Sequence, residues 1–139
     1  MKLSVKSDYA ARAVLALSKR YATGLAVRAE DVAVEQGIPG NYLVQILIEL
    51  KSAQIVRSQR GKEGGYLLAR PPAEITMGQV LRAIHGQLFD TPALSDPRCP
   101  VELRQAWLKM RASLDEAADG ITFQQLAEAS EDKGKMYYI

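Results

Sequence analysis

The chain has 139 residues and is poor in the side chains on which most catalytic and metal sites depend, with one cysteine, Cys99, and one histidine, His85. A single cysteine excludes a disulfide within the chain and a site built from four cysteines of one chain. No apolar run reaches the roughly 18 residues that a membrane-spanning helix needs. The first residues also lack the apolar segment of an export signal. We therefore expect a cytoplasmic protein with no membrane anchor.

Recognisable catalytic arrangements are also missing. The glycine-rich stretch at 61–65 (GKEGG) lies between two strand-like segments and does not precede a helix, so it does not predict a nucleotide-binding loop. His85 comes at the end of an expected helix, where a histidine complements the helix dipole, and this favours a structural role over metal ligation. We expect the protein not to be an enzyme.

The net charge of +2 is unevenly distributed along the chain. Residues 1–72 hold 11 Lys and Arg against 6 Asp and Glu, whereas residues 73–139 hold 7 against 10. A basic first half favours contact with a polyanion such as nucleic acid. Chance scatter in a short chain would also give such an asymmetry, so the argument needs the patterns that follow.

Apolar periodicity predicts helices at 8–22, 28–36 and 40–53. Ser7 is the expected N-cap of the first. The second ends at Gly37, and the third follows after about four residues, which matches helix-turn-helix spacing. One face of the third helix should be buried and carries Leu43, Ile46, Leu47 and Leu50. The remaining surface should present Asn41, Tyr42, Val44, Gln45 and Ile48.

Two short strands are expected at 55–59 and 66–70, joined by a glycine turn. A helix-turn-helix followed directly by a β-hairpin is the order of a winged helix. Arg60 and Lys62 lie in this hairpin, and an arginine near its tip suits the negative potential of a DNA minor groove. The fold class predicted is mainly α with a small β-hairpin wing.

The second half of the chain predicts a long helix outside this unit. A capping box at Thr76 and Gln79 begins a fourth helix, which ends at Gly86, and a proline-rich loop follows at 87–100. From Val101 to about 118 an apolar seam recurs at spacings of four and three, and consists of Leu103, Trp107, Met110, Leu114 and Ala117. The seam favours packing on a second copy, with packing on its own domain as the alternative.

We divide the chain into a DNA-binding unit (1–86), a sensor loop (87–100), and a dimerisation helix with a C-terminal helix that packs back on the first unit (101–139). A second capping box, Thr122 with Gln125, begins that last helix, expected to end near 130. The tail at 131–139 either docks on a partner subunit or is a loose end.

Five stretches give the chain a recognisable family likeness: MKLSVKSDYAARA at the start, GIPGNYLVQ at 37–45, RGKEGGYLLAR at 60–70, ITMGQVLRAI at 75–84 and ITFQQLAE at 121–128. With them the chain resembles the bacterial winged-helix regulators of the Rrf-type family over nearly its whole length. The resemblance implies a homodimer on a palindromic operator, with the third helix in the major groove and Arg60 in the minor groove. It places Tyr42 and Gln45 at base-contact positions and Lys6 at a phosphate-contact position.

The chain departs from many relatives at Val44, where they carry glutamate. A glutamate accepts a hydrogen bond from cytosine, whereas valine can only contact a thymine methyl group. Val44 and Ile48 therefore predict half-sites that contain thymine. For Ile48, packing against the wing is an equal alternative.

A second departure concerns the sensor loop, where cluster-binding relatives place three cysteines and this chain has only Cys99. Glu102 stands where some of them have a ligating histidine, so their three-cysteine [2Fe–2S] site cannot be built. Three interpretations of Cys99 remain: an inert residue, a reactive thiol activated by Arg98 and a helix N-terminus, or a ligand of an atypical [2Fe–2S] cluster with non-cysteine ligands. In the last, Asp8 would lend a carboxylate across the dimer.

The sequence therefore predicts a sequence-specific DNA-binding transcriptional regulator, a dimeric repressor that responds to redox, iron–sulfur or cysteine-metabolism signals. The alternative is a winged-helix module for protein interactions, in which DNA binding is weak or controlled by a regulatory partner protein. Salt dependence separates the two, because phosphate contacts make DNA affinity fall steeply with ionic strength.

Overall fold

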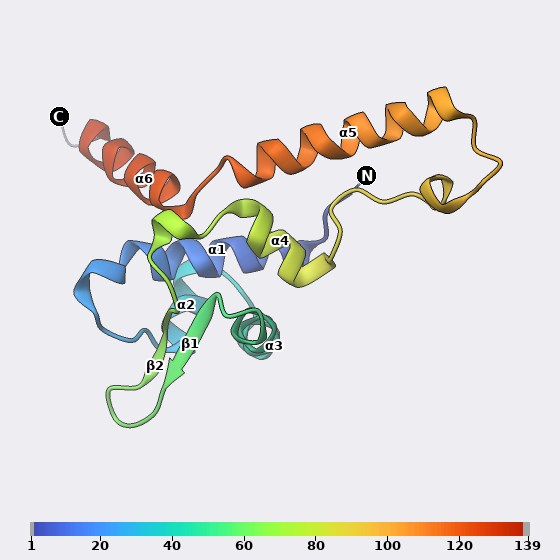
Figure 1. Cartoon of the computed structure of the whole chain (residues 1–139). Helices are drawn as coiled ribbons and strands as arrows, with labels where there is room; N and C mark the ends of the chain where they lie inside the picture. Colours follow the sequence, from blue (N-terminus) through green and yellow to red (C-terminus); the bar gives the residue numbers. More distant parts are fainter. Residues whose placement is uncertain (1, 138–139) are drawn as a thin grey trace.

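The computed structural model describes the backbone of residues 2–137 and the side chains of residues 2–132. The expected mainly helical chain with one hairpin is confirmed (Figure 1). The elements in the described part are α1 (Val5–Lys19), α2 (Ala29–Gln36), α3 (Gly40–Ser52), β1 (Val56–Gln59), β2 (Gly65–Leu68), α4 (Met77–His85), α5 (Val101–Asp119) and α6 (Phe123–Tyr137). The two alternatives for the tail, docking on a partner or a loose end, concern residues 131–139, and the side chains of 133–139 lie outside the described part. None of the described helices is long and apolar enough to cross a membrane.

Helix α1 forms the centre of the molecule and begins earlier than its sequence predicts. Its N-cap is Ser4, whose Oγ accepts a hydrogen bond from the Ser7 backbone N–H at 3.3 Å. The prediction of Ser7 as the cap was wrong, because Ser4 can cap the same run three residues upstream. Ser7 is then buried within the helix. The helix also ends at Lys19, three residues before its predicted end, and Tyr21–Thr23 form a separate 3-10 turn.

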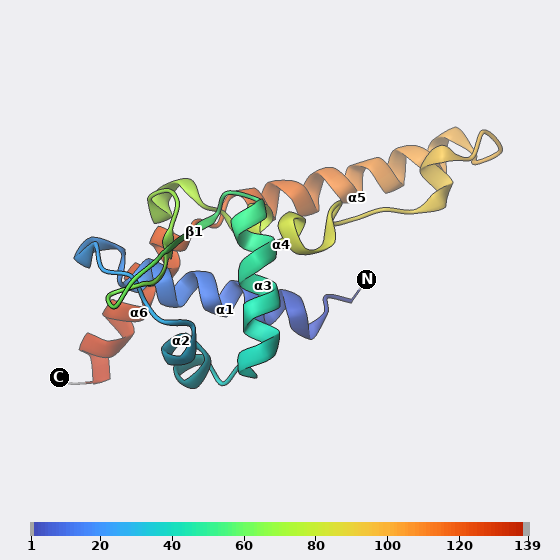
Figure 2. The same cartoon turned by 90° about the horizontal axis from the view of Figure 1, so that it is seen from below.

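The core is built around α1 and includes side chains from α2, α3, α4 and the start of α6. Helices α3, α4 and α6 each pack on α1. Helix α3 crosses α1 (Figure 2) and buries its predicted face completely, with Leu43, Ile46, Leu47 and Leu50 each at most 1% exposed. These four side chains belong to one apolar cluster with Val14 and Leu17 of α1 and Phe123 of α6. The turn into α3 follows Gly37, which ends α2 in a left-handed conformation at φ +67°.

The hairpin is anchored to the helical unit by a third extended segment. Val56 pairs with Leu68 and Gln59 with Gly65 across the two strands. On the outer side of β2, the Val27 N–H donates to the Tyr66 carbonyl at 2.9 Å, and the Tyr66 N–H returns a bond at 2.8 Å. Gly65 has φ +152°, and a Cβ there would overlap the Val27 carbonyl oxygen. Only glycine therefore fits at this close approach.

The strands are shorter than expected because Ile55 ends a helix instead of starting a strand. Its N–H donates to the Leu50 carbonyl at 3.0 Å and closes the C-terminus of α3. Helix α4 begins with the expected capping box at Thr76 and Gln79. The box at Thr122 and Gln125 is also formed, with bonds of 3.1 and 3.2 Å, and α6 continues past its expected end.

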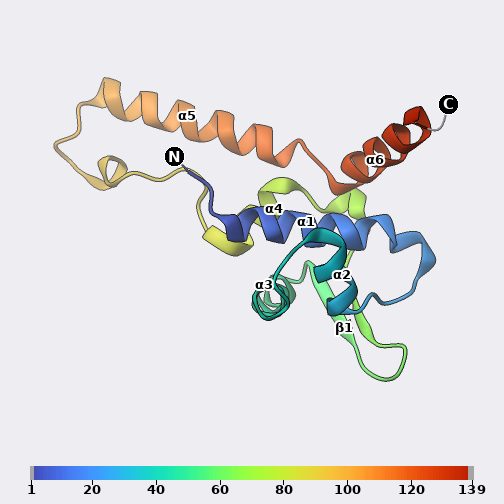
Figure 3. The same cartoon turned by 180° about the vertical axis from the view of Figure 1, so that it is seen from behind.

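Helix α5 lies over α4 at its C-terminal end and projects beyond the core at its N-terminal end (Figure 3). Among its residues only Ala118 is buried. Ala118 packs with Leu81 of α4 and Leu88, with the half-buried Leu114 against them. Ala117, another residue of the seam, is exposed in the single chain. Helix α6 then returns to the core through Phe123, which is fully buried.

Candidate nucleic-acid interface

The outer face of α3 and the hairpin project from the same side of α1, away from α5 (Figures 1 and 3). Asn41, Val44, Gln45 and Ile48 are all exposed on this helix. Val44 has an exposed fraction of 41% and Ile48 one of 55%. Burial of the opposite face fixes the orientation of α3, and so leaves two aliphatic side chains and two amides directed outward.

Tyr42 is held in place by contacts with α1. Its ring meets that of Tyr9 edge to face, with the ring centroids 5.6 Å apart and the planes at 80°. The guanidinium of Arg12 lies 5.8 Å from the Tyr9 centroid. Aromatic pairs of this geometry restrict ring position. Tyr42 is thus half-buried at the edge of the exposed face of α3.

Lys6, which the family resemblance places at a phosphate-contact position, forms an ion pair within the chain. Its Nζ lies 2.6 Å from Oε2 of Glu49, which joins the first turn of α1 to α3. Both side chains are partly exposed, but the paired oxygen, Glu49 Oε2, is itself shielded from solvent. No local pattern predicts that Lys6 and Glu49 would meet, since they are 43 positions apart.

The connection between β1 and β2 carries Arg60 and Lys62, both exposed. Neither forms an ion pair with another residue that the structure describes. A Cβ at Gly64 would overlap the Gln59 carbonyl oxygen, so this turn requires glycine. Close to the turn, Lys51 Nζ donates to Ser58 Oγ at 2.7 Å and links the end of α3 to β1. The two cations are therefore presented on a hairpin that is joined to α3.

Arg28 is a candidate contact that the sequence analysis missed. It occupies the N-cap position of α2 and is exposed. With Val44 it lines a shallow hollow between α3 and the glycines of the hairpin, residues 64–65. An arginine at the start of the first helix of a helix-turn-helix was visible in the sequence and could have indicated this position.

The sensor loop places Cys99 half-buried directly before α5. Its thiol donates to the Pro100 carbonyl at 3.6 Å. Arg98, expected beside the thiol, is 91% exposed and pairs with Asp96 at 3.3 Å. The same loop is fastened to α5 by Arg104, which donates to the Asp96 carbonyl at 2.6 Å.

No metal or cluster site is built within one chain. The described residues contain no group of three or more His, Cys, Asp or Glu side chains able to hold a metal ion. Asp8 pairs with Arg12 of its own helix at 2.8 Å. His85 Nε2 lies 3.1 Å from the hydroxyl of Ser4, which links the ends of α4 and α1. The residues of one chain therefore do not fit an iron–sulfur cluster.

The apolar seam of α5 divides into two parts. Leu114 packs on its own chain, and Trp107 lies against Phe89 of the loop with ring centroids 6.0 Å apart. Leu103 and Met110 are 45% and 53% exposed, and no described residue of the chain covers them. The open part of the seam is thus the N-terminal half of α5, which projects from the core.

Comparison with known proteins gives a consistent result. The model of the family Rrf2, iron-dependent transcriptional regulator, matches residues 3–129. The HTH-type protein Rv1287 of Mycobacterium tuberculosis is 39% identical over 132 residues, which cover 91% of this chain and 81% of that protein. The HTH-type transcriptional regulator CymR of Bacillus subtilis is 30% identical over 141 residues, the full length of both.

Solved structures agree with this result. That of CymR, the global cysteine regulator of B. subtilis, matches with a TM-score of 0.82 and 28% identity, and covers 93% of this chain and 98% of that one. The structure of T. potens IscR matches with a TM-score of 0.79 and 31% identity, and covers 99% of this chain and 97% of that one. The predicted winged-helix fold is thereby confirmed, and these relatives indicate no enzymatic family. The chain belongs to the Rrf2 family of DNA-binding transcriptional regulators.

Proposed function

We propose that the protein is a dimeric repressor that binds a palindromic DNA site through α3 and the hairpin. One observation carries this proposal: the exposed face of α3, with Val44 and Ile48 turned outward, lies on the same side of the molecule as a glycine hairpin that carries two unpaired cations. A helix fits the major groove, and a hairpin beside it reaches the backbone and the minor groove.

Each side chain then has a role that follows from its chemistry. The amides of Asn41 and Gln45 hydrogen-bond to base edges, and Val44 and Ile48 contact thymine methyl groups. Tyr42, fixed against Tyr9, donates its hydroxyl to a phosphate or a base. These residues set the sequence preference.

Cations at the edge of the interface supply affinity without sequence information. Arg60 inserts into the minor groove, where narrow A·T tracts concentrate negative potential. Lys62 and Arg28, which line one surface hollow together, contact phosphates. Lys6 exchanges Glu49 for a phosphate when DNA binds, so that its ion pair is broken on binding.

The open half of the α5 seam is covered by the same seam of a second copy. Such an isologous contact buries Leu103 and Met110 of both subunits and relates the two α3 helices by a two-fold axis. The axis explains why the operator should be palindromic, because each subunit reads one half-site.

To test the wing assignment, duplexes that bind the protein are selected from a random-sequence pool. The affinity for the selected duplexes is then measured at several salt concentrations. Arg60→Ala should weaken binding by about 1–3 kcal/mol and remove a preference for A·T pairs beside the half-site. Arg98→Ala is the matched control, an exposed arginine in the sensor loop, and should leave both unchanged. Equal affinity and equal A·T preference in Arg60→Ala and the parent would contradict the wing assignment. An affinity that hardly depends on salt would favour the protein-interaction alternative.

The same selection tests the role of Val44. The half-sites returned should contain thymine at the contacted positions, and Val44→Glu should shift the preference toward cytosine. Val44→Ala, which keeps an apolar but shorter side chain, should weaken the thymine preference without creating one for cytosine. A parent selection without thymine at these positions would refute the assignment.

We further propose that Cys99 is the signal input and acts as a free thiol. One thiol per chain, without a group of ligands around it, supports oxidation by a peroxide to a sulfenic acid over cluster binding. Peroxide should then change DNA affinity in the parent and not in Cys99→Ser. An anaerobic absorption spectrum and an iron count on fresh protein test the competing idea: visible bands with stoichiometric iron would refute the thiol proposal and make Asp8→Ala the next variant.

A further inference from the structure

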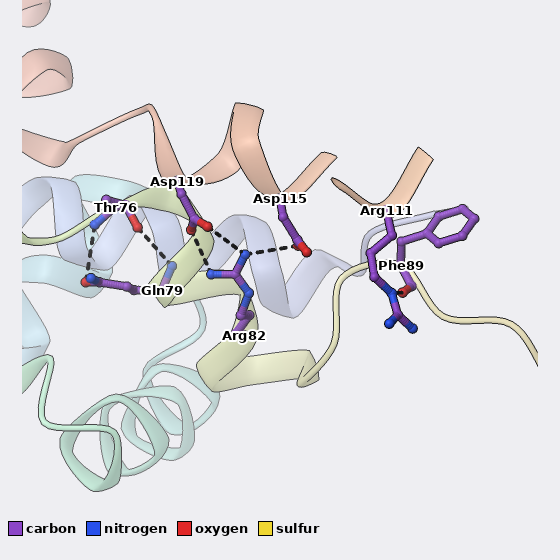
Figure 4. A network of polar contacts seen from close by, with 7 residues as sticks. All are labelled: Thr76, Gln79, Arg82, Phe89, Arg111, Asp115 and Asp119. Carbon is purple, nitrogen blue, oxygen red and sulfur yellow. Dashed lines mark hydrogen bonds and ion pairs between the residues drawn. The ribbon is translucent and has the colours of Figure 1, made fainter. Parts of the chain in front are cut away.

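Two residues of the family stretch at 75–84 have no part in DNA reading. Gly78 and Arg82 are four positions apart on α4, and both meet α5. Arg82 bonds to Asp115 and Asp119 (Figure 4), and a Cβ at Gly78 would overlap the Asp119 side chain. Gly78 is the second residue of α4 and does not have a positive φ, so its backbone conformation does not require glycine and its presence points to a packing reason.

Arg82 forms a bidentate bridge from α4 to the C-terminal end of α5. Its Nη1 donates to Asp119 Oδ1 at 2.7 Å, and its Nη2 donates to Asp119 Oδ2 and to Asp115 Oδ1, both at 3.0 Å. The two carboxylates are one turn apart on α5 and converge on one guanidinium (Figure 4). A planar fork held by two carboxylates restricts both the distance and the rotation between the helices.

Gly78 provides the space for this bridge. A Cβ at residue 78 would overlap Asp119 Oδ1 and would lie 2.9 Å from Arg82 Nη1. The carboxylate of Asp119 thus occupies the volume that any side chain at position 78 would fill. The glycine and the arginine act together, one to admit the carboxylate to the surface of α4 and the other to hold it.

A second attachment stands one to two turns further along α5. Arg111 Nε donates to the Phe89 carbonyl at 3.1 Å, and its Nη2 to Asp90 at 3.3 Å. Beyond these bonds the helix projects from the core with its seam open. The direction of the projecting half is therefore determined by the joint between α4 and α5.

We propose that Gly78, Arg82, Asp115 and Asp119 form a clamp that sets the direction of α5, and through it the separation of the two recognition helices on DNA. The inference rests on the proposed function, a dimer on a palindrome. Helix α4 packs on α1, and α1 packs on α3, so the clamp connects the dimer seam rigidly to the reading face.

The expected size of the effect follows from the length of the lever. A helix of 19 residues is about 28 Å long at 1.5 Å per residue. A tilt of about 10° at the joint would move its far end by about 5 Å, more than the 3.4 Å rise of one base pair. Loosening the clamp should therefore relax the half-site spacing that the dimer accepts, while each subunit reads its half-site as before.

The test uses the full-length protein and the palindrome selected from the random-sequence pool, resynthesised with its spacer changed by one or two base pairs. A duplex with a single half-site serves as a second probe. The variants are Gly78→Ala and Arg82→Gln, with Arg20→Gln as the matched control, since Arg20 forms an ion pair between α1 and α2 and does not touch α5. Gly78→Ala introduces a better helix former, so that loss of helix propensity cannot explain its effect.

The parent should bind duplexes with an altered spacer about tenfold more weakly than the selected palindrome. Both clamp variants should bind them only about twofold more weakly, and their affinity for the single half-site should be unchanged. Arg20→Gln should keep the parental ratio. If both variants kept the tenfold discrimination, or lost single half-site binding in parallel, the clamp proposal would be overturned. A parent with no optimal spacing would instead refute the palindromic dimer, which separates the two failures.

Discussion

Helices α3 and α5 have the same kind of apolar periodicity, but the chain buries the apolar face of α3 and leaves part of that of α5 exposed. Each repeats apolar side chains at spacings of three and four. In α3 the repeated side chains are at most 1% exposed, whereas Leu103 and Met110 of α5 are about half exposed. Periodicity thus predicts that a helix has an apolar face, but it does not tell whether the chain itself or a second copy covers that face.

The difference separates two kinds of stability. The α3 face contributes to folding of one chain, at any protein concentration. The open seam of α5 contributes only when a second copy binds, and its contribution depends on concentration. Each prediction below tests that separation or the joint between the two regions.

The largest effect is expected from truncation of the same residue type in the two helices. Leu47→Ala removes a fully buried side chain and should lower the free energy of unfolding by about 2–5 kcal/mol. Leu103→Ala should cost far less when measured at low concentration, where the chain is a monomer. Urea unfolding followed by circular dichroism at two protein concentrations measures both, and equal losses at low concentration would refute the comparison.

Next in size is the effect of a charge in the open seam. Met110→Lys should raise the dimer dissociation constant by about 100-fold, or ~2.7 kcal/mol, because an ammonium group would be desolvated in the interface. Ala112→Lys places the same charge on the opposite, exposed side of α5 and should leave assembly unchanged. Sedimentation equilibrium measures the constant. An unaltered dimer in Met110→Lys would mean that another surface forms the interface.

Signals that lie within a few residues of one another could be predicted from the sequence. The two capping boxes, the stop at Gly37 and the buried face of α3 all depend on local geometry, and the structure contains each of them. The turn glycines of the hairpin were predicted, but not that Gly65 lies against Val27, which is remote in sequence.

Contacts between distant residues could not be predicted in the same way. Lys6 with Glu49, and Arg82 with Asp119, are pairs whose members are 43 and 37 positions apart. Either member alone is an ordinary surface charge. Even a local signal misleads when two residues can play the same role, as Ser4 and Ser7 can at the N-cap of α1. The candidate DNA-contact residues remain predictions, because side-chain exposure shows what can bind but not what does.

A stabilising substitution within the α3 region should have a smaller effect and should not alter assembly. Gln54 follows α3 with φ +61°, and its N–H donates to the Lys51 carbonyl, as in a helix end that normally carries glycine. Gln54→Gly should raise the free energy of unfolding by about 1 kcal/mol. Ala53→Gly, one residue earlier at φ −85°, should lower it by about 0.5–1 kcal/mol. Thermal unfolding measures both, and a Gln54→Gly variant no more stable than the parent would contradict the strain at this position.

The smallest effect concerns the joint itself and appears as a dependence on pH. The hydrogen bonds from Arg82 lower the pKa of Asp119 below its ordinary value. A carboxyl whose pKa is lower in the folded chain stabilises it above the unfolded pKa of about 3.9, and the stabilisation disappears as the pH falls through the folded value. The difference in free energy of unfolding between the parent and Asp119→Asn should therefore have its full size at pH 6–7 and become smaller below about pH 4.

Repeating the comparison in an Arg82→Gln background isolates the cause of this dependence. Without the guanidinium, Asp119 has no partner that lowers its pKa, so the asparagine substitution should give the same small difference at both pH values. Denaturant unfolding at pH 7 and pH 3.5 measures the four proteins. A dependence that survives in Arg82→Gln would assign the lowered pKa to another group, and α5 would then be held to α4 mainly by the apolar contacts of Leu114 and Ala118.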